Sequence, residues 1–236
     1  MKSKIKNFFG RISVFFQFKT KERIKLEKLF DWQMEQLKEI GISKDIISRF
    51  REKKDEVLNH FLYFCSLPGY YEMTAFLPVI PLEILKRSFP FPLSTINKQE
   101  LSSGSSRNLA ESIDTEEVYD LRSDTEIPTP YFIFGLENGM NENSISSVSP
   151  SIAQDLFART RLSPLNLSEA LSMLIIFPGF YNGNGEKISI MGSRYRNEKV
   201  IPEFFRNGKG FQLSWAYDSN LGVEKVYPVC WERKFF

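Results

Sequence analysis

The spacing of apolar residues predicts two helices in the first third of the chain. In Glu22–Ile40 apolar residues recur every three or four positions, and Gly41 follows as a natural stop. Ser43 can cap a second helix, in which the same period continues to Cys65. Two amphipathic helices joined by a short loop predict an antiparallel helical hairpin.

The first eighteen residues have the pattern of a basic amphipathic helix. In Met1–Phe18 the large apolar residues fall on one helical face, and Lys and Arg fall mostly elsewhere; the apolar residues are Ile5, Phe8, Phe9, Ile12, Phe15 and Phe16. Arg11 interrupts the apolar run and no cleavage site of small residues follows, which argues against a signal peptide. The segment is also too short and too charged to span a bilayer. Two interpretations stay open: the helix packs on the protein's own core, or it contacts a membrane surface or a groove on a protein partner.

The pattern changes after the hairpin. Thr74–Leu82 is apolar but contains two prolines, which limits it to an edge strand or an extended crossing. Between residues 94 and 129 the apolar period disappears and Ser, Asn and acidic residues dominate, which predicts a flexible acidic insertion. We therefore divide the chain into an amphipathic helix (1–20), a helical hairpin with an extended segment (21–93), the insertion (94–129) and a C-terminal domain (130–236).

The C-terminal domain has alternating strand and helix patterns. Tyr131–Leu136 is rich in aromatic and β-branched residues and predicts a strand. Ser149-Pro150 can open one helix, and Asn166 with Glu169 can cap another. Three further strands are expected, at Lys187–Met191, Phe211–Tyr217 and Lys225–Trp231. The predicted fold is α+β: a helical hairpin followed by a mixed α/β domain with a small, mainly antiparallel sheet.

Composition narrows the chemistry. The chain is 42% hydrophobic and 25% charged, as in an ordinary soluble globular protein. Its two cysteines lie far apart, which suggests neither a disulfide framework nor a zinc site and fits a reducing, cytoplasmic compartment. His60 is the only histidine, and we interpret it as a helix-surface or core residue. We therefore predict no metal, no cofactor and no catalytic residue, because the usual bases, ligands and activated nucleophiles are nearly missing.

Charge is unevenly distributed despite a net charge of only +2. Residues 1–28 contain nine Lys or Arg against two Glu, whereas residues 98–126 contain eight Asp or Glu against three Lys or Arg. The basic segment with its phenylalanines could engage nucleic acid. The balanced total charge and the missing recognition motif argue against that partner. Because the Phe residues follow one helical face, they favour a membrane surface or a protein groove.

Several stretches resemble an uncharacterised bacterial family known only as a domain of unknown function. They are DWQMEQLKEIGI, TAFLPVIPLEIL, RLSPLNLSEALSMLIIFPG, ISIMGSRYRNEKVIPEFF, FQLSWAY and CWER. The matching positions include Arg161, Pro164, Leu165, Glu169, Pro178, Gly192, Ser193, Arg194, Pro202, Trp215, Cys230 and Arg233. The chain departs from the family between Gln212 and Arg233, where the family is richer in Trp and Cys. The resemblance covers most of the chain from about Asp31; it implies a bacterial soluble protein and supplies no activity.

One polar cluster is a candidate ligand site: Arg161, Glu169, Arg194 and Arg233. Arginine suits forked recognition of a carboxylate or phosphate, and the Gly192-Ser193 turn would let backbone amides face an anion. The alternative is that these residues form structural ion pairs that tie loops to helix ends. We predict a non-enzymatic binding or interaction module; the alternative is a protein or enzyme that binds a small anion through this arginine-lined surface.

Overall fold

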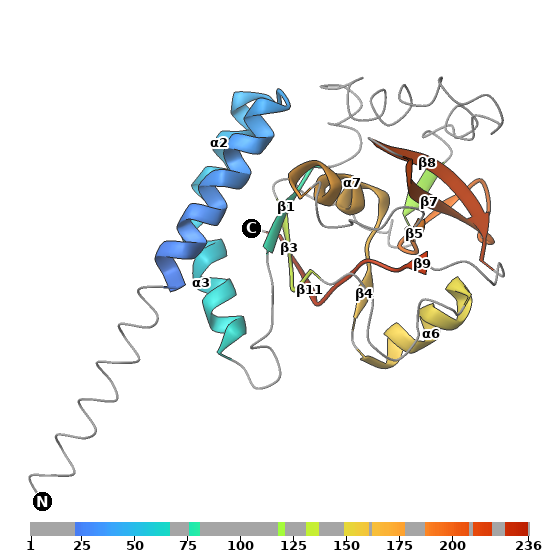
Figure 1. Ribbon diagram of the computed structural model, residues 1–236. Helices are drawn as coiled ribbons and strands as arrows, with labels where there is room; N and C mark the ends of the chain where they lie inside the picture. Colours follow the sequence, from blue (N-terminus) through green and yellow to red (C-terminus); the bar gives the residue numbers. More distant parts are fainter. Residues whose placement is uncertain are drawn as a thin grey trace, which may run out of the picture. The chain divides into compact units, whose positions relative to one another are not determined.

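A computed structural model describes residues 22–66, 76–80, 118–120, 131–136, 149–160, 162–177, 187–207, 210–218 and 225–235 (Figure 1). The chain divides into two compact units, Met1–Glu72 and Met73–Phe236, which we call the helical unit and the sheet unit and describe separately. The fold is α+β, as predicted. The expected amphipathic helix Met1–Phe18 lies outside the described residues, as do residues 94–117 and 121–129 of the expected insertion.

The helical unit contains a helix over residues 22–39, then α2 (Lys44–Glu52) and α3 (Lys54–Cys65). The predicted stop and cap are both present: Gly41 has a φ of 84°, and the Ser43 side chain accepts a hydrogen bond from the backbone N–H of Ile46. The prediction of one continuous second helix was wrong at Lys53, where α2 ends and α3 begins. Residues 51–56 are all charged, so no apolar side chain anchors this turn to a core.

Ion pairs between the helices fix their direction. Arg23 bonds to Asp55 at 2.6 Å, Asp31 to Lys54 at 2.7 Å and Glu35 to Arg51 at 3.0 Å. Residues further along the first helix therefore pair with residues earlier in the segment that forms α2 and α3. This is the register of an antiparallel hairpin. The first helix buries its apolar face, and so do α2 and α3. Six apolar side chains among the described residues of this unit are fully buried: Phe30, Met34, Leu37, Phe50, Val57 and Leu58.

The sheet unit has a three-stranded antiparallel sheet in the order β1-β3-β11. It is formed by β1 (Phe76–Val79), β3 (Tyr131–Phe134) and β11 (Glu232–Phe235). The proline-containing strand β1 lies at the edge of this sheet, as predicted. Helix α7 (Leu167–Ile176) packs against β1 (Figure 1), and the Ser172 hydroxyl accepts a bond from the Ile80 amide at 3.0 Å.

A second sheet has four strands in the order β8-β7-β5-β9. The strands are β5 (Lys187–Ser189), β7 (Val200–Asn207), β8 (Gly210–Tyr217) and β9 (Lys225–Val226), and only β5 and β9 are parallel. The sequence did not predict β7, because Pro202 and Glu203 interrupt its apolar pattern. Pro202 is tolerated because it lies beyond the last β5–β7 pair, and its carbonyl accepts a bond from the Ile190 amide at 2.8 Å.

Two short strand pairs complete the described part of the unit. Strand β4 (Ser163–Pro164) pairs with β10 (Val229–Cys230), and β2 (Val118–Asp120) pairs with β6 (Ser193–Tyr195). The interpretation of residues 94–129 as a flexible insertion is therefore wrong at Val118–Asp120. The expected strand Lys225–Trp231 is instead divided into β9 and β10, and β11 begins directly after it, at Glu232.

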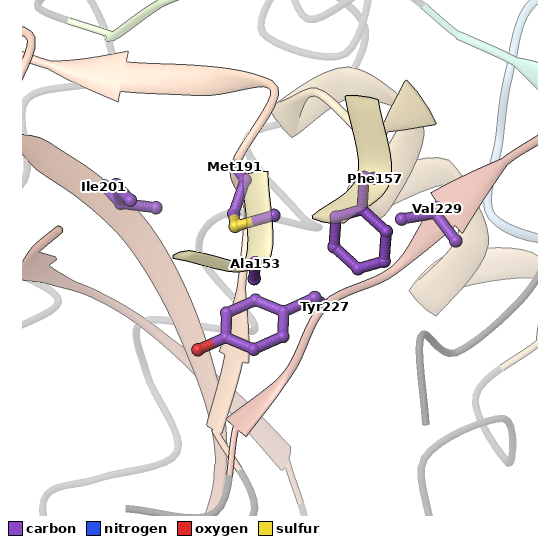
Figure 2. Close-up of a cluster of buried hydrophobic side chains, with 6 residues drawn as sticks. All are labelled: Ala153, Phe157, Met191, Ile201, Tyr227 and Val229. Atoms are coloured by element: carbon purple, nitrogen blue, oxygen red, sulfur yellow. The ribbon is translucent and has the colours of Figure 1, made fainter. Parts of the chain in front are cut away.

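Helix α6 (Pro150–Thr160) contributes Ala153 and Phe157 to a buried apolar cluster shared with β7, β10 and the residues next to strands β6 and β9. Figure 2 shows this core cluster: Ala153, Phe157, Met191, Ile201, Tyr227 and Val229. The rings of Phe157 and Tyr227 meet edge to face, with centroids 6.4 Å apart. Ser149-Pro150 begins this helix, as its sequence predicted.

Candidate functional site

The start of helix α7 is closed by reciprocal hydrogen bonds. The Asn166 side chain accepts a bond from the Glu169 amide at 2.8 Å, and the Glu169 carboxylate accepts one from the Asn166 amide at 2.9 Å. This is the predicted capping box, with Asn in the place of the usual Ser or Thr. It holds the Glu169 carboxylate over the first turn of the helix, where the helix dipole favours negative charge.

Arg233 of β11 binds the same carboxylate with a fork of two bonds. Its Nε donates to Oε1 of Glu169 at 2.6 Å, and its Nη2 donates to Oε2 at 2.8 Å. The Glu169 side chain is completely buried and that of Arg233 is 10% exposed. Burial works against the charged guanidinium, but the Glu169 carboxylate together with Cys230 and Tyr131 outweighs burial and raises the pKa of Arg233.

The guanidinium of Arg233 also donates hydrogen bonds to two groups of β4. Nη1 donates to the Ser163 hydroxyl at 2.5 Å, and Nη2 also donates to the Pro164 carbonyl at 2.7 Å. One side chain from β11 therefore ties β4 to the start of α7. With both edges bonded internally, Arg233 has little capacity left for an external anion.

The Gly192-Ser193 turn lies against the chain just before α7. The Gly192 amide donates to the Leu165 carbonyl at 2.9 Å, and the Ser193 hydroxyl accepts a bond from the Leu167 amide at 2.8 Å. A Cβ atom at Gly192 would lie 2.6 Å from the Leu165 oxygen. The expectation that this glycine would let the backbone approach an anion is corrected, because the space beside Gly192 is filled by the backbone of Leu165. The Leu167 amide at the start of α7 is bonded to the Ser193 hydroxyl, so it is not available to an anion.

Arg194 has a different set of partners from Arg233. Its Nε donates to the Glu198 carbonyl, and its Nη1 donates to the carbonyls of Met191 and Ser193, at 2.8 to 2.9 Å. Nη2 donates to the Gln154 side chain at 3.1 Å. Burial lowers the pKa of Arg194 and nearby Asp218, Tyr119 and Glu198 offset this in part. The residue is 5% exposed, and these bonds join β6 to α6.

The four predicted site residues are therefore brought together only in part. Glu169 and Arg233 form one buried pair, whereas Arg194 bonds to main-chain carbonyls and to Gln154. Arg161 lies outside the described residues. An ion pair of the kind that the structural alternative expected is present between Glu169 and Arg233, whereas Arg194 is held by main-chain carbonyls and by the Gln154 side chain.

A second buried carboxylate was not expected from the sequence. Glu203 accepts a bond from the Ser189 hydroxyl at 2.7 Å, and the Lys187 ammonium lies 3.7 Å from its other oxygen. Burial, and then the charge of Glu203, raise the pKa of Tyr227. Ser189 and Glu203 lie opposite each other in the β5–β7 register. The sequence could reveal this pair only if β7 had been predicted, and Pro202 argued against that strand.

Comparison of the chain with protein-family models, curated proteins and solved structures gives no match. The resemblance to the bacterial family stays a prediction. Within the described ranges, no three His, Cys, Asp or Glu side chains gather as metal ligands would. The helices in those ranges also include none with the length and apolar character needed to cross a bilayer.

Proposed function

We propose that this protein is a non-enzymatic interaction module that binds an anionic membrane surface through Met1–Phe18. The observation that carries the proposal is the distribution of charge. Residues 22–66 contain nine basic and nine acidic side chains, whereas residues 1–21 contain six Lys or Arg and no Asp or Glu. A basic segment with large apolar residues at helical spacing suits a surface that offers both negative charge and an apolar interior.

The internal bonding of the charged residues supports this choice over a small anionic ligand. In the sheet unit the guanidinium groups of Arg194 and Arg233 are directed at internal acceptors. In the helical unit, ion pairs such as Arg23–Asp55 and Asp31–Lys54 join helix to helix. Residues 1–21 contain no Asp or Glu that could pair with their Lys and Arg residues.

Exposed apolar side chains lie close to where the basic segment enters the helical unit. Ile24 is 48% exposed and Tyr63 is 61% exposed. Arg23 donates to Asn59 at 2.7 Å, which brings the start of the helix over residues 22–39 beside α3, one turn before Tyr63. Both residues can therefore add apolar area to a contact that begins with residues 1–18.

The test is flotation of the full chain with vesicles of phosphatidylcholine alone or with one third phosphatidylglycerol. We expect binding only to the anionic vesicles, and weaker binding as salt rises. Replacing Lys2, Lys4 and Lys6 with Gln should reduce binding by at least tenfold. The matched control replaces the exposed Lys28, Lys44 and Arg49 with Gln, which changes net charge equally and should leave binding within twofold.

Three results would contradict the proposal. They are no binding to either vesicle, equal binding to both, and an equal loss in the two triple variants. Deleting Met1–Lys19 gives a further decision: a large drop in thermal stability would show that the segment packs on the protein's own core.

A further inference from the structure

Strand β8 forms one edge of the four-stranded sheet, and among the described residues it pairs with β7 alone. The register runs from Asn207 opposite Gly210 to Val200 opposite Tyr217, so the pairing covers the whole strand. A two-residue connection joins β7 to β8, and the Asp218 amide donates to the Lys199 carbonyl at 2.8 Å at the far end.

This register settles which backbone groups point away from β7. In an antiparallel pair, directly opposed residues alternate between hydrogen-bonded and non-hydrogen-bonded pairs. The bond from Asp218 to Lys199 places residues 210, 212, 214 and 216 in the bonded set. The N–H and C=O groups of Leu213, Trp215 and Tyr217 therefore point outward from the sheet edge.

Strand β8 itself contains neither of the residue types, charged and proline, that commonly prevent strand pairing. Gly210–Tyr217 is eight residues long and contains no charged residue and no proline. The opposite edge strand, β9, has only two residues. Natural sheets protect long edges with charges, prolines or bulges, so an uncharged strand of this length suits a pairing partner. At its end, Trp215 and Tyr217 stack edge to face at 5.7 Å, and Tyr217 is 51% exposed.

We infer that β8 pairs antiparallel with β8 of a second copy of this chain, so that two four-stranded sheets join across a two-fold axis. The outward groups require an extended strand as partner, because only a strand offers amides and carbonyls at the same spacing. A second copy offers an edge of equal length, and the missing charges mean that no like charges meet across the axis. Isologous pairing also closes both edges at once and gives a dimer instead of a fibre.

This inference goes beyond the proposed function, because it concerns the sheet unit and does not depend on whether residues 1–18 bind a membrane. With the two-fold axis beside Ser214, residues 211–217 of one copy pair with residues 217–211 of the other. Leu213 then lies opposite Trp215 of the second copy. Leu213 belongs to a buried apolar row across the sheet, with Phe204, Ile188 and Val226, and the dimer would extend this row.

Sedimentation of the full chain between about 1 and 100 μM measures the assembly, and amide hydrogen exchange locates it. We expect a dimer whose outward amides, at Leu213, Trp215 and Tyr217, are protected at high concentration and lose protection on dilution. The inward amides of Ser214 and Ala216 are the internal control and should stay protected throughout. A monomer at 100 μM, or a dimer whose outward amides exchange freely, would overturn the inference.

A pair of variants separates the backbone from the side chain. Trp215→Pro and Trp215→Val both remove the indole ring, but only proline removes the outward N–H, and neither disturbs an amide bonded to β7. We expect the dimer dissociation constant of Trp215→Pro to exceed that of Trp215→Val by at least tenfold. Equal constants would overturn the inference; if Trp215→Pro does not fold, the exchange pattern of the unmodified chain decides.

Discussion

The helical unit carries its ion pairs on the surface, whereas the sheet unit encloses one in its interior. In each ion pair found in residues 22–66, at least one side chain is more than a third exposed, as in Asp31–Lys54. The Arg233 and Glu169 side chains are 10% and 0% exposed. Water competes for the first kind of pair and is excluded from the second.

This difference shows that the number of ion pairs in a unit does not measure what they contribute to its stability. Exposed pairs contribute about 0–1 kcal/mol each, because solvation and side-chain entropy offset most of the attraction. A buried pair contributes little when compared with an apolar pair, but removing one partner strands an uncompensated charge. The predictions below test this contrast, from the largest expected effect to the smallest.

Glu169→Gln should cause the largest loss, about 3 kcal/mol of unfolding free energy, because it leaves Arg233 buried without a counterion. Gln can still accept the capping bond from the Asn166 amide, so the loss reports the charge and the one acceptor that Arg233 loses. Urea unfolding measures it. The double variant Glu169→Gln with Arg233→Met keeps a side chain that can cap α7 and removes the unpaired charge, so it should recover part of the loss. A single-variant loss below about 1 kcal/mol would show that the pair is not buried as described.

Gly192→Ala should cost about 1–3 kcal/mol, because the added methyl group meets the Leu165 carbonyl and the Asn166 amide, both main-chain atoms. The movement would loosen the turn that supports the start of α7. Thermal unfolding measures the loss, with Ser48→Ala as a control that substitutes an exposed residue of α2. An unchanged melting temperature would mean that this close approach does not exist.

Tyr227 should make the sheet unit sensitive to alkali. Its pKa is raised in the folded state, so the folded protein keeps the hydroxyl protonated while the unfolded chain ionises near pH 10. The stabilisation from neutral Tyr227 is thus complete below pH 10 and falls by about 1.4 kcal/mol per pH unit above it. Between pH 9 and 11 the parent should lose about this much more stability than Tyr227→Phe, and parallel losses would contradict the assignment.

Asp31→Asn should have the smallest effect, below about 1 kcal/mol, although it removes the partner of Lys54 at 2.7 Å. Adding 0.5 M NaCl should shrink this difference further, because salt screens exposed charges. The same salt should leave the Glu169→Gln loss nearly unchanged. Equal salt sensitivity at the two sites would break the comparison between the units.

What the sequence predicted correctly was local. The hairpin stop at Gly41, the start of α6 at Pro150 and the capping pair Asn166 and Glu169 each depend on residues within four positions of one another. Such contacts follow from helix geometry alone. The α+β class was also predictable, because apolar period changes from helical to alternating along the chain.

What the sequence could not predict depends on distant partners. Arg233 and Glu169 are 64 residues apart, and nothing in either segment indicates the other. Strand β2 was missed because its three residues are held by pairing with β6, not by an apolar pattern of their own. Strand β7 was missed because a proline argues against a strand unless its place at the end of the β5 ladder is known.

The distance along the chain between Glu169 and Arg233 also sets an order of events during synthesis. Ribosomes add about 5–20 residues per second, so a 64-residue separation means that Glu169 is synthesised roughly 3 to 13 seconds before the arginine that neutralises it. The helical hairpin, whose partners are nearer in sequence, can form earlier. During that interval the Glu169 carboxylate has no arginine partner and stays solvated. Strands β1 and β3 can pair with each other, but the edge of β3 that binds β11 remains unpaired. Until β11 is synthesised, the nascent sheet unit therefore lacks both the partner of Glu169 and one strand of its three-stranded sheet.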